Sequence, residues 1–177
     1  MRSVSNLSSS RALADITRIH GGTYSYSSVG EVNVVEKMKS TNAIIGGEGN
    51  GGVIYPDLHY GRDALVGIAL FLTYLAERKI SVSNLRSTYP NYFISKNKIK
   101  MKPDTNIDII FSKLEKKYQN ENITMIDGLK IDFDDSWIHL RKSNTEPVIR
   151  IYAESMSQSE SDSLAANMID EIKDIIE

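Results

Sequence analysis

The sequence predicts two domains of different class, an α/β domain followed by an α+β domain. Before Pro90, strand-like and helix-like segments alternate along the chain, which is typical of an α/β layer. After Pro90, consecutive strand-like segments are joined by short turns, which indicates an antiparallel sheet. We therefore expect one domain at residues 1–89 and a second at residues 90–177, with the boundary between Thr88 and Tyr92.

The elements of the first domain follow from its hydrophobic pattern. Strands are predicted at residues 2–7, 23–27 and 43–45, and helices at residues 11–20, 33–39, 62–77 and 82–88. Asn50 and Gly51 stand between two apolar runs, at 43–45 and 53–55, and this pair is a strong hairpin signal. The pattern predicts a mixed sheet in an alternating βα layer.

The second domain is expected to be a four-stranded antiparallel sheet with two helices on one face. Strand character recurs at residues 92–101 and in short segments between residues 123 and 152, with a helix at 105–118. Ser157 and Glu160 form a capping box that begins the last helix. In that helix the apolar residues at helical spacing predict a core-facing stripe: Leu164, Met168, Ile172 and Ile175.

Composition limits the function classes. The chain has 177 residues, 41% of them hydrophobic and 25% charged, which is ordinary for a globular protein. Cysteine is absent, so a disulfide framework, a catalytic thiolate and a Cys-ligated zinc site are excluded. The net charge of −2 argues against a nucleic-acid partner. The most apolar helix, residues 64–75, is too short to cross a membrane, and a cytoplasmic location is expected.

Four lysines alternate along the strand predicted at 92–101 and just beyond it: Lys96, Lys98, Lys100 and Lys102. Alternate residues of a strand project from one face, so the ammonium groups gather there. Two interpretations stay open. The lysines create a positive field for a phosphorylated ligand, or they protect an edge strand against pairing with another chain.

The run from Arg141 to Glu154 gathers groups that bind phosphate. Arg141 and Arg150 each offer a planar fork of donors to phosphate oxygens. Pro147 stiffens the connection between them. Short donors stand in the same connection: Ser143, Asn144 and Thr145. The alternative is an ordinary turn on a solvated surface, with nearby glutamates neutralising the arginines.

A glycine-rich loop, Gly46 to Gly52, carries a single carboxylate at Glu48. The predicted hairpin explains the glycines but not the acid. A carboxylate with no neighbouring side chains is a bidentate acceptor, well suited to two adjacent sugar hydroxyls. The loop is therefore a candidate sugar site.

The segment from Arg141 to Pro147, reading Arg-Lys-Ser-Asn-Thr-Glu-Pro and followed by Arg150, resembles the phosphate-binding loop of the α-D-phosphohexomutases. That family contains phosphoglucomutase, phosphomannomutase and phosphoglucosamine mutase, and its loop belongs to the last of four domains, which has a TBP-like fold. The resemblance implies these phosphate ligands: Arg141, Ser143, Asn144, Thr145 and Arg150.

The glycine-rich loop is similar to the family's sugar-binding loop, Gly-Glu-x-Ser-Gly-His, with Asn50 in place of Ser and Gly52 in place of His. The resemblance implies that Glu48 and Asn50 bind sugar. Two further turns resemble sugar-facing turns of the third domain and imply weaker candidates, Arg11 and Glu31. The alternative for these turns is helix capping, by Ser8 to Ser10 and by Glu31.

The family's catalytic loops, a phosphoserine in Ser-His-Asn-Pro and a magnesium loop Asp-x-Asp-x-Asp-Arg, do not occur in this sequence. We therefore expect no catalytic residue and no metal site in the chain, with Mg²⁺ bound elsewhere in a longer enzyme. The acidic run Asp132, Asp134 and Asp135 is expected to be a solvated turn. The resemblance also implies an activator of the glucose 1,6-bisphosphate type.

The sequence as a whole is interpreted as the C-terminal part of a phosphohexomutase, covering most of the third domain and all of the fourth. Such an enzyme would interconvert hexose 1-phosphate and hexose 6-phosphate, while this part would bind substrate and be inactive alone. The alternatives are a phosphoglucosamine mutase, a stand-alone phosphosugar-binding module and an interaction domain. A truncated first domain would expose an apolar sheet face that a helix should cover, so self-association is also expected.

Overall fold

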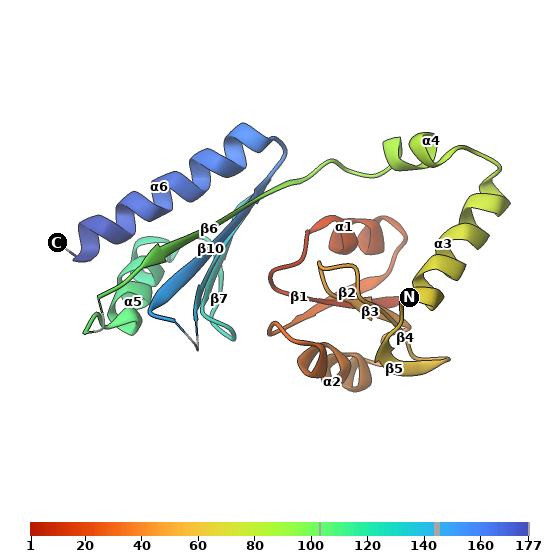
Figure 1. Cartoon of the computed structure of the whole chain (residues 1–177), viewed down its shortest axis with the longest axis horizontal. Helices are drawn as coiled ribbons and strands as arrows, with labels where there is room; N and C mark the ends of the chain where they lie inside the picture. The colour runs from red at the N-terminus through yellow and green to blue at the C-terminus, as the bar shows by residue number, and fades with distance from the viewer. Residues whose placement is uncertain (103, 144–145, 177) are drawn as a thin grey trace. The chain divides into compact units, whose positions relative to one another are not determined.

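The structure is a computed structural model that describes residues 1–102, 104–143 and 146–176. The chain divides into two compact units, Met1–Asn91 and Tyr92–Glu177, and each is described by itself. Figure 1 shows the elements of both units. Within the described residues, no helix is both long enough and apolar enough to cross a membrane.

Unit 1 contains a mixed five-stranded sheet in the order β2-β1-β3-β4-β5. Its strands are β1 (Arg2–Asn6), β2 (Thr23–Ser27), β3 (Ile45–Gly47), β4 (Val53–Tyr55) and β5 (His59–Arg62). Strand β1 pairs in parallel with β2 and β3, whereas β3, β4 and β5 are antiparallel neighbours. The α/β class and the predicted hairpin are confirmed.

Four helices accompany this sheet: α1 (Ala12–Ile19), α2 (Glu31–Thr41), α3 (Ala64–Arg78) and α4 (Val82–Ser87). Helices α1 and α2 lie on opposite faces of the sheet (Figure 1). A small core joins α2 to the sheet through buried apolar side chains: Val4, Val34, Met38, Ala43 and Ile54.

Several boundaries in unit 1 differ from the prediction, and two of them have a clear cause. Strand β3 begins at Ile45 rather than at residue 43, because the Ala43 N–H still donates to the Met38 carbonyl at the end of α2. Helix α3 begins at Ala64 rather than at residue 62, because Arg62 belongs to β5 and the Asp63 side chain caps the helix. The strand β5 itself was not predicted, since its residues show no apolar alternation.

Helix α3 is apolar but has no buried residue. Leu65, Ile68 and Leu72 are 77%, 53% and 54% exposed. A soluble domain rarely leaves such a contiguous apolar surface uncovered. The helix ends at Arg78, and the next residue, Lys79, adopts the left-handed conformation with φ 52°.

Unit 2 contains an antiparallel five-stranded sheet in the order β6-β10-β9-β8-β7. Its strands are β6 (Phe93–Lys100), β7 (Asn122–Thr124), β8 (Leu129–Asp132), β9 (Trp137–Lys142) and β10 (Val148–Ser155). The α+β class is confirmed, but the predicted count of four strands is wrong. Strand β7 pairs with β8 over three residues and adds the fifth strand.

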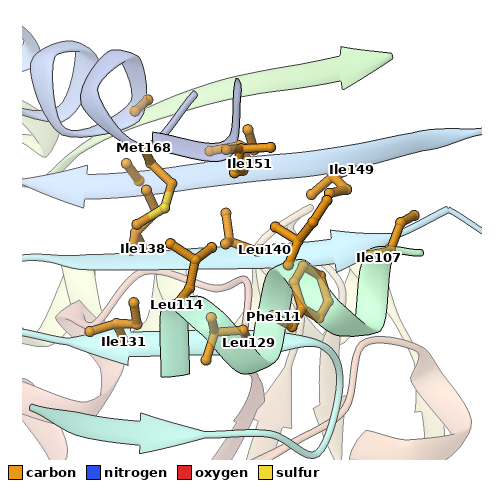
Figure 2. Packing of buried hydrophobic residues seen from close by; sticks show 14 of the residues in the cluster. Ile107, Phe111, Leu114, Leu129, Ile131, Ile138, Leu140, Ile149, Ile151 and Met168 are labelled. Atoms are coloured by element: carbon orange, nitrogen blue, oxygen red, sulfur yellow. The ribbon is translucent and has the colours of Figure 1, made fainter. Parts of the chain in front are cut away.

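Helices α5 (Ile107–Lys117) and α6 (Gln158–Ile176) both pack against this sheet. Figure 2 shows Phe111 and Leu114 of α5 and Met168 of α6 among the isoleucines and leucines of the strands. The predicted apolar stripe of the last helix belongs to this core. Ser157 accepts a hydrogen bond from the Glu160 N–H at 3.2 Å, as the capping box predicted.

Candidate functional site

Two antiparallel pairings place three cationic side chains in one row on the sheet of unit 2. Arg150 on β10 lies opposite Arg141 on β9 and opposite Lys98 on β6. Directly opposed residues of antiparallel strands project from the same face, so these three side chains, here called the cationic row, are neighbours. Like charges in that position destabilise strand pairing. The row therefore lowers the stability of the sheet unless an anion or acidic side chain compensates it.

The structure corrects the predicted position of Arg141. The sequence placed it at the hairpin end, just beyond its strand, but β9 extends to Lys142, so Arg141 lies opposite Arg150 inside the paired strands. The Ser143 N–H donates to the Val148 carbonyl at 3.0 Å and carries the pairing up to the connecting loop. Asn144 and Thr145, the other two predicted donors, lie outside the described residues.

A cavity of about 310 Å³ lies beside the cationic row. Its lining residues are Lys96, Asn97, Lys98, Glu146, Val148, Arg150 and Tyr152. Three of these carry positive charge and only Glu146 carries negative charge, so the cavity attracts anions. The Lys96 ammonium lies 5.5 Å from the centroid of the Tyr152 ring, which holds it against the sheet. Strand β6 is also the edge of the sheet, so both interpretations of its lysines are compatible with the structure.

Arg141 differs from the rest of the row because an acid faces it. Its Nε lies 2.9 Å from Asp127 Oδ2, and both side chains are more than three-quarters buried. Asp127 belongs to the turn between β7 and β8. Nothing in the sequence pattern indicated that Asp127 would contact Arg141.

In unit 1 the glycine-rich loop is the tip of the β3–β4 hairpin. The Glu48 N–H donates to the Gly52 carbonyl at 3.0 Å, and Gly51 has a φ of 90°, which favours glycine. A side chain at position 52 would collide with the aliphatic stem of Arg62. The glycine at 52 therefore lets Arg62 cross the loop and reach Glu48.

The Glu48 carboxylate is held on both oxygens. Its Oε1 accepts from Asn6 Nδ2 at 2.9 Å and from the Gly30 N–H at 3.3 Å, while Arg62 Nη1 lies 3.4 Å from Oε2. Only 8% of the Glu48 side chain is exposed. These contacts fix the direction of the carboxylate and leave it part of its acceptor capacity, since a carboxylate has about four lone-pair sites.

Arg62 is the residue of this site that sequence reasoning missed. Its backbone N–H and its Nε donate to the two carboxylate oxygens of Glu31, at 3.1 and 2.8 Å. These bonds, the backbone one first, lower the pKa of Glu31. The sequence does set Arg62 apart, because it is the only lysine or arginine between Lys39 and Arg78. Glu31 therefore binds Arg62 rather than only capping α2.

The remaining sugar-site candidates have different surroundings. Asn50 lines a cavity of about 440 Å³ together with Glu31 and Arg62, and its Oδ1 accepts from the Gly52 N–H at 3.1 Å. Arg11 precedes α1, where its Nε lies 3.7 Å from Asp15 Oδ2. Ser10 accepts from the Ala12 N–H at 3.2 Å, which is the capping role that the sequence left open.

The acidic run after β8 does not form a metal site. Asp132 pairs instead with Lys130 Nζ at 3.0 Å. Over residues 1–102, 104–143 and 146–176, no three His, Asp or Glu side chains gather closely enough to hold a metal ion. The described residues therefore do not fit a magnesium ion.

Two family models match the chain. The model described as phosphoglucomutase/phosphomannomutase, alpha/beta/alpha domain III, matches residues 2–92, and the one described as phosphoglucomutase/phosphomannomutase, C-terminal domain, matches residues 98–171. A phosphoglucosamine/phosphogalactosamine mutase of Sulfurisphaera tokodaii is 34% identical over 98% of this chain and 38% of its own length. A phosphoglucomutase/phosphomannomutase of Thermococcus kodakarensis is 35% identical over 88% of this chain and 34% of its own length.

Solved structures show the same arrangement of elements. A phosphoglucomutase/phosphomannomutase family protein of Burkholderia thailandensis superposes with a TM-score of 0.75 and 28% identity, over 97% of this chain and 36% of that one. The Aspergillus fumigatus N-acetylphosphoglucosamine mutase in complex with GlcNAc-6P and magnesium gives a TM-score of 0.67 at 15% identity, over 98% of this chain and 38% of that one. The second likeness concerns the fold alone. The chain thus spans less than two-fifths of the length of these relatives.

Proposed function

Since the chain belongs to the phosphoglucomutase/phosphomannomutase family, we propose that it is the substrate-binding C-terminal part of a hexose-phosphate mutase. Such an enzyme interconverts hexose 1-phosphate and hexose 6-phosphate. In this proposal unit 2 binds the phosphate that is not transferred, and unit 1 binds hydroxyl groups of the sugar.

The cationic row carries the proposal for unit 2. Three opposed positive charges on neighbouring strands are unfavourable for folding, and the cavity beside them is lined by three cations and one anion. A phosphate group would supply the missing negative charge and accept paired hydrogen bonds from an arginine. Ser143, Asn144 and Thr145 are proposed as further phosphate ligands, by the resemblance of the loop.

The held carboxylate of Glu48 supports the proposal for unit 1. Its direction is fixed by Asn6 and Arg62, so a sugar hydroxyl would meet an acceptor that loses little freedom on binding. Asn50 and Glu31, which line the neighbouring cavity with Arg62, are proposed as additional polar contacts.

The proposal is tested by titrating the 177-residue chain with glucose 1-phosphate while recording backbone amide NMR spectra. Perturbed signals are expected on β9 and β10 around Arg141 and Arg150, and around Glu48. Methyl glucoside, which has no phosphate, should leave the β9 and β10 signals unchanged. An absence of perturbation by any hexose phosphate in these strands would overturn the proposal.

A second candidate substrate is an amino sugar phosphate. The observation in its favour is the 34% identity to a relative named phosphoglucosamine/phosphogalactosamine mutase. The acidic groups near the sugar loop, Glu31, Glu48 and Asp63, would also attract a substrate ammonium group. Tighter binding of glucosamine 6-phosphate than of glucose 6-phosphate would favour this candidate, and equal affinities would remove it.

We assign the phosphoryl transfer to regions of the longer enzyme that this chain does not contain. The sequence has neither the phosphoserine loop nor the aspartate loop of the family. The proposed Mg²⁺ and the bisphosphorylated activator would act there. The chain alone should therefore form no glucose 6-phosphate from glucose 1-phosphate, even with magnesium and glucose 1,6-bisphosphate present, and measurable turnover would contradict the assignment.

Self-association is proposed to occur through helix α3. Its apolar side chains are exposed along the helix, with Leu65 and Leu72 more than half exposed. Pairing two copies would remove this surface from water. Sedimentation should detect dimers that Leu72→Glu dissociates, and a monomer at high protein concentration would count against the proposal.

A further inference from the structure

The turn between β7 and β8 packs closely against β9, the strand that carries Arg141. Gly128 in this turn has a φ of 85°, and a Cβ atom there would collide with the Leu140 carbonyl and lie 3.2 Å from Arg141 Cα. Only glycine fits both the backbone conformation and the space. The contact fixes the turn, and with it Asp127, beside the base of the Arg141 side chain.

Asp127 meets the inner part of the guanidinium group. Its Oδ2 lies 2.9 Å from Arg141 Nε, with 21% of the Asp127 side chain and 23% of the Arg141 side chain exposed. Nε is the nitrogen nearest the main chain, whereas the two terminal nitrogens form the outer edge that binds an oxyanion with two parallel donors. The contact is an ion pair without hydrogen-bond geometry, since the buried Nε has no hydrogen-bond partner within the described residues. An acid held beside Nε therefore restricts the guanidinium group without occupying its outer edge.

His139 contacts the backbone of Asp127. It lies two residues before Arg141 on the same face of β9, is 1% exposed, and its Nε2 is 2.7 Å from the Asp127 carbonyl. Because a carbonyl can only accept, Nε2 carries the proton. Burial lowers the pKa of His139 to about 4, so the ring is neutral near pH 7 and adds no charge beside the row.

We propose that Asp127 and His139 are positioning residues that hold the Arg141 guanidinium for a phosphate ligand. The inference rests on the proposed phosphate site. His139 fixes the backbone of Asp127, and Asp127 fixes Arg141, so neither residue needs to touch the ligand.

A positioning role and simple electrostatics predict opposite effects of Asp127→Asn on phosphate affinity. Asp127→Asn removes a negative charge next to the cationic row, which by charge alone would strengthen anion binding. If Asp127 instead positions Arg141, the same substitution weakens binding. We expect glucose 1-phosphate to bind about tenfold more weakly, because a 1.4 kcal/mol loss is tenfold in affinity.

The test measures the affinity of the full chain for glucose 1-phosphate by NMR titration. Asp135→Asn, an exposed acid of the same unit, is the matched control and should leave the affinity within about twofold of the unsubstituted chain. A double-mutant cycle completes the design: in an Arg141→Ala background, Asp127→Asn should no longer weaken binding, because only its effect on the local charge remains.

His139 supplies an independent variant should Asp127→Asn fail to fold. His139→Gln keeps a donor and should retain most of the affinity, whereas His139→Leu should weaken binding. Equal or tighter binding by Asp127→Asn, an unchanged effect in the Arg141→Ala background, or equal affinities of the two His139 variants would overturn the inference. If the unsubstituted chain binds no hexose phosphate, the proposed function fails instead.

Discussion

The two candidate sites differ in whether their charged side chains have partners of opposite charge. In unit 1, Glu48 is paired with Arg62, and Arg62 is paired with Glu31, so each charge meets an opposite charge within the site. In unit 2, Arg150 stands between two further cations, and of the three only Arg141 has an ion-pair partner within the described residues. A network of paired charges suits polar hydroxyl groups, whereas an excess of positive charge suits an anion.

The largest effect is expected from removing the central cation. Arg150→Ala should weaken glucose 1-phosphate binding about a hundredfold, because hydrogen bonds to a charged group are each worth about 1.5–3 kcal/mol. Stability should stay equal or rise slightly, since a like-charge contact is relieved. Titration and thermal melting of the same sample measure both. Lys116→Ala, on the outside of α5, is the charge-matched control. If Arg150→Ala lost stability together with affinity, the comparison of the two sites would be contradicted.

The next largest effect concerns pH. The folded pKa of His139, about 4, lies below the unfolded value near 6.5, so the folded state binds fewer protons and is destabilised as pH falls from 6.5 towards 4. Between pH 6.5 and 5 the loss should be about 2 kcal/mol in the free energy of unfolding. Denaturant titrations at each pH measure it. His139→Gln should flatten this dependence, and an equally steep curve for that variant would exclude His139 as its source.

A smaller effect should follow from breaking the network of Glu31, Arg62 and Glu48 in unit 1. Arg62→Met leaves Glu48, a buried side chain, with Asn6 and Gly30 but without its cation. We expect unit 1 to lose about 1–2 kcal/mol, while the phosphate-dependent NMR signals of β9 and β10 remain. Amide hydrogen exchange resolves the two units separately. Arg18→Met, a more exposed arginine of α1, is the control.

The smallest effect is expected at the edge of the row. Lys98→Met should weaken binding about threefold and reduce its dependence on salt, since a partly solvated cation contributes about 0.5–1 kcal/mol. Titrations at low and high salt separate this contribution from a loss of folding. If the affinity stays constant at low salt, Lys98 serves only to protect the edge strand.

The sequence was informative where structure depends on nearby residues. The hairpin at Asn50-Gly51, the cap at Ser157 and the stripe of α6 all follow from neighbours within a few positions. The pairing of Arg62 with Glu31 joins residues 31 positions apart, and that of Asn6 with Glu48 joins residues 42 apart. Such contacts depend on which strands become neighbours, which local patterns do not encode.

The register of the paired strands explains why the sequence did not predict the cationic row. The residues Arg141 and Arg150 were predicted as a phosphate pair, but their direct opposition depends on how far β9 continues towards the loop. The hydrophobic pattern predicted an earlier end for this strand, because Arg141 and Lys142 are not apolar. The third cation, Lys98, lies 52 positions from Arg150 and enters the row only through the β6–β10 pairing.

The proposed association through the exposed apolar helix α3 would give the chain a characteristic temperature response. Association through apolar surface is driven by water entropy near room temperature and weakens on cooling, with a negative heat-capacity change. Samples of the 177-residue chain should therefore be most monomeric when cold and should scatter more light on gentle warming, well below unfolding.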